Sequence, residues 1–557
     1  MQVVLGVNCF SHDTAAALLV DGALVAFVEE ERVNREVHTR RFPHRAIDSV
    51  LRQGGVDIGD VDIVAFAHRA GTDLARGGLD ALRRGAPKRL ATQAYVDARL
   101  ARRERTFRRH WGYTGEVVNV GHHLAHASST FYAGPFDTAA VLTMDRGGDF
   151  LCTTMNAGRG TTLEVLRQVR NPNSLGEVYT AVTRHIGFHP NDEGKVMGLA
   201  PYGSAKLVDD MRELIRLEPD GGYQVDYSWF GYPREGAPVS KKFVERFGPA
   251  RQPESELTEQ AKDLAYAVQD LIEETALHVA RGLRAKSPTA KLCMAGGLVL
   301  NSVMNERIYR EAGFDDVFIQ PAAGDAGNAL GAALWVWHNR LGQPRTWQME
   351  HAYYGESWSD ADCAAALRRA GLSFRQVADR GAEAADRLAE GKVVGWFQGR
   401  AEAGPRALGA RSILADPRRD DMRDIVNAKV KRREWFRPFA PSVLHEHGPE
   451  WFEGYHPAPF MLTVLPIRTD KRSVVPAVTH VDGTGRVQSV TREQNEAFHD
   501  VISKFNDRTG VPIVLNTSFN LRGEPMVHRP SEAINDYLRS EMDSLVLGPF
   551  VVDKVAR

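Results

Sequence analysis

Cysteine is scarce in this chain. Only four cysteines occur among 557 residues, Cys9, Cys152, Cys293 and Cys363, and no two of them form a Cys-x-x-Cys pair. Disulfide frameworks and thiolate zinc sites are typical of cysteine-dense or closely spaced sequences, so we expect neither here. The composition favours a reducing compartment, and we expect a cytoplasmic protein.

Long apolar runs and a dominant charge sign are also missing. No apolar run approaches the roughly 20 residues that span a bilayer, and the N-terminus lacks a basic region followed by an apolar core. We therefore expect neither membrane insertion nor export. The formal net charge of -1 excludes a generally basic nucleic-acid-binding protein, although local basic patches stay open. No internal repeat and no Walker-type Gly-Lys-Thr motif occurs.

The remaining composition is that of an ordinary globular protein, with 43% hydrophobic and 25% charged residues. A chain of 557 residues is too long for one hydrophobic core, so we expect two or three domains. A polar, turn-rich stretch at 343–358 predicts a boundary. It divides the chain into domains 1–350 and 351–557.

Three short strands are predicted at the N-terminus, from apolar runs at 3–7, 15–20 and 23–28. Asp21-Gly22 between two of these runs is a strong hairpin signal. The polar turn between the first two runs contains His12 and Asp13. Actin, sugar-kinase and heat-shock-chaperone ATPases open each of their duplicated lobes with a similar unit, whose turn faces a phosphate. The alternative is that both residues only form the turn.

Two histidines lie four residues apart in the segment from Gly121 to Ala127. In a helix, His122 and His126 would share one face and could hold one divalent metal ion between them. A polar helix cap or a hydrogen-bonded core cluster would explain the same pattern. A metal centre needs a third protein ligand, and Asp325, set among small residues before a predicted helix, suits that role. The same setting suits a helix N-cap equally well.

Two predicted strands end in glycine pairs. The strand at 139–144 is followed by Asp145 and then Gly147-Gly148, a pattern that suits binding of a hydroxyl, a metal-bound water or a phosphate, since glycines let a ligand approach the backbone. A tight turn between strands is the alternative. The strand at 291–295 runs into Gly296-Gly297 and then a helix, which is typical of a nucleotide-binding turn.

Two densely charged segments precede these motifs and the histidines. Residues 29–41 have the pattern of a solvated loop or helix end, with Arg40 and Arg41 left open as anion-binding residues. Residues 83–110 form a basic run that we interpret as a solvated helix face. The run has little aromatic interleaving and no recognition motif, so we expect no nucleic-acid partner.

Cationic side chains are concentrated again after residue 399. The segments 399–414 and 427–441 combine arginine and lysine with glycine and proline, which is not the pattern of a helix face. Because arginine binds phosphate through two parallel hydrogen bonds, this set predicts a site for a polyanion such as a nucleoside triphosphate or an acyl phosphate. A predicted strand at 511–515 ends in Asn516-Thr517-Ser518, whose polar groups would complete such a site.

Taken together and in order, these motifs resemble the O-carbamoyltransferase family of the NodU, CmcH and TobZ type. The resemblance rests on the hairpin with His12-Asp13, on His122-x-x-x-His126, on Gly296-Gly297, on Gly324-Asp325-Ala326-Gly327 and on residues 193–203, 404–412, 436–441 and 516–520. It implies an α/β protein with an actin-like (ASKHA) metal-binding domain at 1–350 and an α/β, YrdC-like domain at 351–557.

The resemblance also implies a two-step reaction. The second domain would convert carbamoyl phosphate and ATP, with Mg as a possible companion of ATP, to carbamoyl adenylate and pyrophosphate. A hydroxyl of a small-molecule acceptor, as in antibiotic biosynthesis, would then attack the adenylate in the first domain. A threonylcarbamoyl-type tRNA-modifying enzyme is the alternative, and oligomeric state and acceptor identity stay open.

The family motifs assign roles to residues of this chain. Fe(II) or Zn, which these ligand types do not distinguish, would be held by His122, His126 and Asp325. The adenylate would be lined by Gly296, Gly297 and Asn301, and ATP and carbamoyl phosphate would be held by Arg406, Lys431, Arg437, Arg486 and Asn516. His12 is the expected base, because an unperturbed imidazole titrates near neutral pH, and Asp145 is expected to orient the acceptor.

Overall fold

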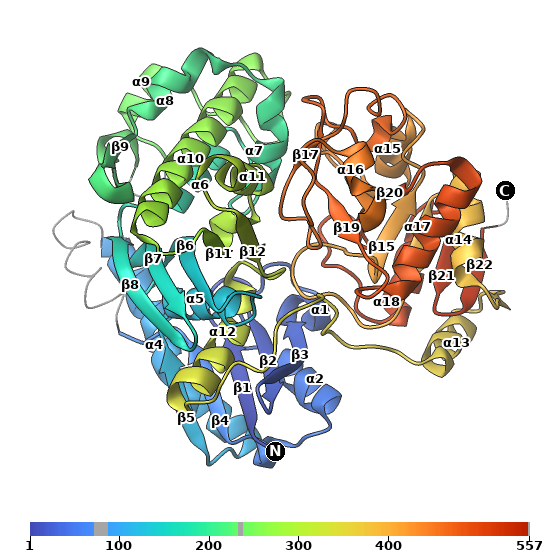
Figure 1. Cartoon of the computed structure of the whole chain (residues 1–557), viewed down its shortest axis with the longest axis horizontal. Coiled ribbons are helices and arrows are strands. Elements are labelled where there is room, and N and C mark those ends of the chain that lie inside the picture. The colour runs from blue at the N-terminus through green and yellow to red at the C-terminus, as the bar shows by residue number, and fades with distance from the viewer. Residues whose placement is uncertain (72–86, 232–237, 555–557) are drawn as a thin grey trace. The chain divides into compact units, whose positions relative to one another are not determined.

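The computed structural model describes residues 1–71, 87–231 and 238–554, which form two compact units (Figure 1). Unit 1 comprises Met1–Val25, Arg40–Ile47 and Gly54–Met349. Unit 2 comprises Ala26–Thr39, Asp48–Gln53 and Glu350–Arg557. The predicted domains are continuous in sequence, whereas unit 2 also takes in two short N-terminal segments.

Two five-stranded sheets share one topology. Their orders are β3-β2-β1-β4-β5 and β12-β11-β6-β7-β8, so numbering each sheet's strands along the chain gives 3-2-1-4-5 in both. In each sheet the first two strands are antiparallel and the fourth runs parallel to the first. This duplication agrees with the predicted actin-like α/β fold, which is confirmed. The strands are β1 Val3–Asn8, β2 Ala15–Val20, β3 Ala23–Glu29, β4 Ile63–Ala67, β5 Glu116–Val120, β6 Thr138–Gly148, β7 Leu151–Arg159, β8 Thr162–Arg170, β11 Lys291–Ala295 and β12 Asp316–Ile319.

Two apolar helices pack closely against these sheets and each other. Helix α12, Asn328–Trp335, lies against β1, β2 and helix α5, His122–Phe131. Glycines make the approach possible: a Cβ at Gly6 would lie 1.9 Å from the Ala329 carbonyl oxygen, and one at Gly331 would lie 1.8 Å from that of Ala125. The close packing brings the histidines of α5 beside the turn that precedes α12.

The other helices of unit 1 surround this core. None of the helices in the described ranges is both long and apolar enough to cross a membrane. Two short strands, β9 Ile215–Glu218 and β10 Gly222–Val225, pair in antiparallel fashion. The helices are α4 Pro87–Trp111, α6 Leu175–His185, α7 Glu193–Leu199, α8 Val208–Arg212, α9 Lys241–Phe247, α10 Glu259–Lys286 and α11 Ser302–Glu311, while most of helix α2, His44–Gly54, belongs to unit 2.

Unit 2 is built on an eight-stranded sheet, which confirms the α/β prediction for the C-terminal half. Strands β14, β15 and β21 are buried along their whole length, as in sheets covered on both faces. The sheet order is β13-β22-β21-β14-β15-β20-β16-β19. Its strands are β13 Arg375–Gln376, β14 Val394–Phe397, β15 Arg411–Ala415, β16 Ala440–Leu444, β19 Gln488–Val490, β20 Ile513–Ser518, β21 Ser544–Leu547 and β22 Phe550–Asp553, and its main helices are α13 Asp360–Arg369, α14 Arg380–Ala389, α17 Glu496–Thr509 and α18 Pro530–Arg539.

The charged segment that follows β3 is not a solvated loop, and that prediction is wrong for its first half. Helix α1, Glu30–Asn34, belongs to unit 2, and Glu29, Glu30 and Arg32 are buried. Arg32 pairs with Glu29 at 3.1 Å and donates to the Gly404 carbonyl at 2.6 Å. These charged side chains therefore form contacts inside unit 2. The sequence near Arg32 does not reveal them, because Gly404 is far away along the chain.

A buried carboxylate ties the second N-terminal segment into unit 2. Glu356 Oε1 accepts from Arg52 at 2.7 Å, and Oε2 lies 2.8 Å from His528 Nε2 and accepts from Ser49. Burial alone would raise the pKa of Glu356, but the hydrogen bonds with His528 and Arg52 lower it to about 2.

This network predicts an acid-sensitive contribution to stability. Because the folded pKa of Glu356 lies below its ordinary value of 4.5, the contribution is present above about pH 4.5 and is lost as the pH falls from there to about 2. We expect Glu356→Gln to lower the free energy of unfolding at pH 7 by up to about 3 kcal/mol and to flatten its pH dependence. Urea unfolding at a series of pH values measures this, with the exposed Glu390→Gln as control. An equally steep acid loss in Glu356→Gln would contradict it.

Candidate metal centre and cation cluster

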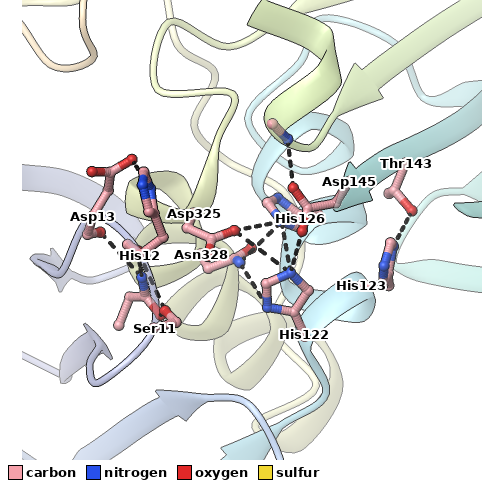
Figure 2. Close-up of polar contacts among 12 residues, drawn as sticks. Ser11, His12, Asp13, His122, His123, His126, Thr143, Asp145, Asp325 and Asn328 are labelled. Carbon is pink, nitrogen blue, oxygen red and sulfur yellow. Dashed lines mark hydrogen bonds and ion pairs between the residues drawn. The ribbon is translucent and has the colours of Figure 1, made fainter. Parts of the chain in front are cut away.

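Four buried or nearly buried side chains converge between α5, β6 and the turn before α12 (Figure 2). The predicted helix forms, and its i, i+4 spacing places His126 Nε2 3.1 Å from His122 Nε2. Asp325 Oδ1 lies 3.3 Å from His126 Nε2 and 3.6 Å from His122 Nε2. Asp145 Oδ2, from the end of β6, lies 3.2 Å from His122 Nε2.

This arrangement fits a divalent metal ion. The four residues each offer a ligand atom, and these atoms lie within 4.8 Å of one another. Ligands bound at about 2.1 Å to one ion are separated from each other by about 3.0–3.4 Å at tetrahedral to octahedral angles, close to the spacings seen here. With nitrogen and oxygen donors only, the set suits Fe(II) or Zn alike.

Charge at the cluster also suits a cation. Burial alone would lower the pKa of His122, but the carboxylates of Asp325 and Asp145 raise it to about 9. Burial lowers the pKa of His126, and the neighbouring histidines hold the pKa of Asp145 well below its usual range despite burial. Two carboxylates and two neutral imidazoles would balance the charge of a divalent ion.

The structure distinguishes between the alternatives for Asp325. Its side chain makes no capping hydrogen bond, and Gly324 and Gly327 occupy the N-cap positions of the turn and of α12. Asp325 instead points at the two histidines (Figure 2). Its position therefore fits a ligand and not an N-cap.

Asp145 links the cluster to the glycine turn after β11. Its Oδ1 accepts from the backbone N–H of Gly297 at 2.8 Å. Gly296 has φ +110°, and a Cβ there would lie 2.1 Å from the Met144 carbonyl oxygen, so only glycine lets the two strand ends approach. Asn301 caps α11 through Met304 N and exchanges hydrogen bonds with Gln269, so its amide is already engaged.

Gly148 leaves room for a histidine rather than for a ligand. A Cβ at Gly148 would lie 2.3 Å from the ring of His122. We expect Gly148→Ala to displace that ring, to destabilise the protein by about 1–3 kcal/mol and to weaken metal binding. Thermal unfolding and metal titration test this. Gly194→Ala, in a helix with open space around it, is the matched control, and equal behaviour of the two variants would contradict the prediction.

His12 lies in the turn between β1 and β2, and its Nδ1 is 2.6 Å from Asp13 Oδ2. Phe10 and Asp13 of this turn both adopt positive φ, at 64° and 51°. The turn at Asp325–Gly327 packs against β1 and β2, and Figure 2 draws His12 on the side of Asp325 away from Asp145. The contact with Asp13 fixes the orientation of the His12 ring, as a general base requires.

Unit 2 contains a cluster of arginines that repel one another. Burial and Arg437 lower the pKa of Arg406 to about 10, and burial with neighbouring Arg406, Arg433 and Arg437 lowers the pKa of Arg486 well below its usual range. The Nε atoms of Arg433 and Arg486 are buried without a hydrogen-bond partner among the described residues. Arg437 also pairs with Glu434 at 3.6 Å, but like charges held close together and partly out of water are costly, so this cluster is suited to receive an anion.

Two further residues that the sequence predicts to bind substrate, Lys431 and Asn516, form hydrogen bonds within the protein. Lys431 Nζ donates to the carbonyl and side-chain oxygens of Ser518 and Asn520, at 2.5–3.1 Å, which satisfies its ammonium within the protein. Asn516 donates to Ala407, Ser442 and Gln488, while its buried Oδ1 has no partner in the described part of the chain. Lys431 thus clamps the loop after β20, and Asn516 has one acceptor to offer.

Three polar residues beside the metal cluster escaped prediction. His68 Nε2 lies 3.0 Å from His122 Nδ1, Asp149 Oδ2 accepts from the His122 backbone N–H at 2.6 Å, and Asn328 Nδ2 lies 3.2 Å from His126 Nε2. Asn328 was detectable, because it falls one helical turn after Asp325. His68 and Asp149 carry no local pattern that singles them out.

The basic run at 83–110 lies partly outside the described residues, which resume at 87. Within α4, Arg103 is buried and donates to the carbonyls of Ala67 and His68, and Arg108 donates to Tyr113 and Gly115. These two arginines serve the fold, so the solvated-face interpretation is wrong for Arg103.

Comparisons with known proteins agree across the chain. Residues 3–334 match the model "Carbamoyltransferase N-terminus" and residues 385–554 match "Carbamoyltransferase C-terminus". Nodulation protein NolNO of Sinorhizobium fredii (strain NBRC 101917 / NGR234) is 39% identical over 98% of this chain and 80% of its own length. The 3'-hydroxymethylcephem-O-carbamoyltransferase of Streptomyces clavuligerus is 28% identical over 96% of each chain.

Proposed function

The chain belongs to the carbamoyltransferase family and is a carbamoyltransferase, and from that premise we propose that it is an ATP-dependent O-carbamoyltransferase of secondary metabolism. Its substrates would be carbamoyl phosphate, ATP and a small-molecule alcohol. The observation that carries the ATP and carbamoyl phosphate part is the arginine cluster of unit 2, whose partly buried cations repel one another. Two phosphate-bearing substrates would neutralise it.

The first step would take place in unit 2, which we propose to be YrdC-like. In balance, carbamoyl phosphate, ATP and water give carbamoyl adenylate, phosphate and pyrophosphate. A carbamoyl carbon is a poor electrophile, and its mixed anhydride with AMP carries a good leaving group. Fixed cations stabilise the charge that develops on the transferring phosphate, with Mg accompanying ATP. The proposed ligands are Arg406, Arg437, Arg486 and Asn516, and Lys431 would support them by holding the loop after β20 in place.

The second step would take place in unit 1. The acceptor oxygen attacks the carbamoyl carbon, the bond to AMP breaks, and His12 takes the hydroxyl proton. The Asp13 carboxylate, 2.6 Å from Nδ1, orients the ring and stabilises the imidazolium that forms. We assign proton acceptance to Nε2.

Around that step, His122, His126 and Asp325 would hold the divalent ion, with Asp145 close enough to share in binding it or to orient the acceptor. When bound, the ion supplies Lewis-acid stabilisation of the adenylate phosphate. Gly296, Gly297 and Asn301 are the proposed lining of the adenylate site. Asn301 would contribute by holding the start of α11, since its amide is engaged.

The relative from Streptomyces clavuligerus acts, by its name, on a hydroxymethyl oxygen. For this chain we propose only the class of acceptor, which is an alcohol oxygen on a small molecule. Arg103 and Arg108 of the basic run bind backbone carbonyls, so these two arginines do not support the tRNA-modifying alternative.

The test is pyrophosphate release by the full chain in the presence of ATP, with and without carbamoyl phosphate. We expect release only when both are present, and mass spectrometry of hydroxylated metabolites added to the reaction to reveal a carbamoylated product. ATP turnover that ignores carbamoyl phosphate would overturn the proposal.

A further inference from the structure

Behind the ligand face of His122 lies a second layer of buried polar groups. The ring turns Nε2 toward Asp145 and Asp325 and Nδ1 toward His68 Nε2, 3.0 Å away, with the Asn328 amide farther from Nδ1 at 3.4 Å. On its far side, His68 Nδ1 lies 3.8 Å from Asp149 Oδ1. His122, His68 and Asp149 are 0%, 6% and 7% exposed. A row of three groups thus runs from Asp149 through His68 to the ligand.

The backbone holds His68 in an unusual conformation. Its φ is +86°, a region that side chains other than glycine rarely adopt and that persists where the surroundings impose it. Arg103 donates to the His68 carbonyl, and the next backbone N–H, of Arg69, donates to Asp149 Oδ1 at 3.1 Å. A buried arginine and a buried carboxylate therefore fix a strained residue with its ring against His122.

We propose that Asp149 and His68 are positioning residues that fix the tautomer of His122 for metal binding. This inference rests on the metal site of the proposed function. A neutral imidazole has one N–H and one acceptor nitrogen, so binding of an ion at Nε2 requires the proton on Nδ1. That N–H donates to His68 Nε2, and the proton of His68 then lies on Nδ1, facing Asp149. Metal-bound histidines usually donate directly to a carboxylate or carbonyl, whereas here an imidazole is interposed.

His126 provides an internal contrast. Its Nδ1 is buried and has no hydrogen-bond partner among the described residues. His68 and Asp149 therefore act on His122 and not on His126. We expect their replacement to leave the hydrogen bonding of His126 Nδ1 unchanged. Asp149 also caps α5 through the His122 backbone N–H, so His68 is the residue that separates positioning from helix capping.

The test compares Co²⁺ binding by full-length variants, using competition with a chromophoric chelator and the visible absorption of the bound ion. His68→Asn tolerates positive φ but loses the ring, and we expect it to bind Co²⁺ about 10–100-fold more weakly with an altered spectrum. His68→Gln returns an amide oxygen to the position of Nε2, and we expect partial rescue. His185→Asn, at a buried histidine whose Nε2 lies 3.1 Å from the Gly248 carbonyl oxygen, is the matched control.

Unchanged affinity and spectrum in His68→Asn would overturn the inference. A separate outcome concerns the proposed function itself: if His126→Ala binds Co²⁺ as tightly as the wild type, the metal site is wrong whatever His68 does. Loss of binding in His126→Ala together with wild-type binding in His68→Asn would reject the inference alone.

Discussion

His126→Ala is expected to separate the two half-reactions. We expect it to lose the bound metal ion and to slow carbamoyl transfer by about three orders of magnitude, because Lewis-acid and electrostatic stabilisation of this kind contribute several kcal/mol. Pyrophosphate release from ATP and carbamoyl phosphate should stay within about twofold of wild type. The reason is structural: His126 belongs to unit 1, whereas the arginine cluster belongs to unit 2.

Metal content, pyrophosphate release and product formation are measured on one preparation of His126→Ala. His185→Ala removes another buried histidine of unit 1 and should retain both activities. Simultaneous loss of pyrophosphate release and transfer in a folded His126→Ala protein would show that the two steps share one site.

Arg486→Met is expected to abolish activity while stabilising the protein. Arg486 lies among Arg406, Arg433 and Arg437, which with burial lower its pKa well below the usual range. Arg486 is partly buried and repelled by its neighbours, so we expect its replacement by an apolar side chain of similar length to be neutral or stabilising, by up to the roughly 1–4 kcal/mol seen when buried ion pairs are replaced in this way. Losing a phosphate-binding cation should reduce carbamoyl phosphate-dependent pyrophosphate release by about 10²–10³-fold.

Pyrophosphate release and urea unfolding without substrates distinguish this prediction from a structural role for Arg486. Arg419→Ala removes an exposed arginine of the same unit, paired with Asp421, and should change neither quantity much. A destabilised Arg486→Met protein that keeps its activity would mean that the arginine supports the fold and does not bind a substrate.

Periodicity and turn chemistry predicted much of the fold. The Asp21-Gly22 hairpin, helix α5 and the strand that ends at Asp145 depend on local preferences, so the sequence reveals them. His122 and His126 are predictable as a pair because helical spacing alone brings them together. Asp325 was predictable as a candidate, but its choice between ligand and cap required the packing of α12 on α5.

What escaped prediction depends on partners far along the chain. Arg32 belongs to a highly charged stretch, yet it is buried because it meets Gly404, 372 residues away. In the sequence, His68 resembles any residue at the end of a strand. Its role becomes visible only in the folded structure, where Asp149 faces its ring and Arg103 of α4 donates to its carbonyl. Lys431 was expected to bind substrate, whereas the folded loop shows its ammonium surrounded by Ser518 and Asn520.

The N-terminal segments of unit 2 have a consequence for how the protein is made. Arg35 donates to the Met526 carbonyl at 2.7 Å, across 491 residues of sequence. At roughly 5–20 residues per second, a ribosome completes that distance in about 25–100 s, so the segment that contains Arg35 emerges long before its partners in the C-terminal half exist. A fragment that starts at residue 351 would lack Arg32, Arg35 and Arg52 and leave Glu356 buried without its arginine. Separate expression of the C-terminal half should therefore fail unless residues 26–53 are supplied with it.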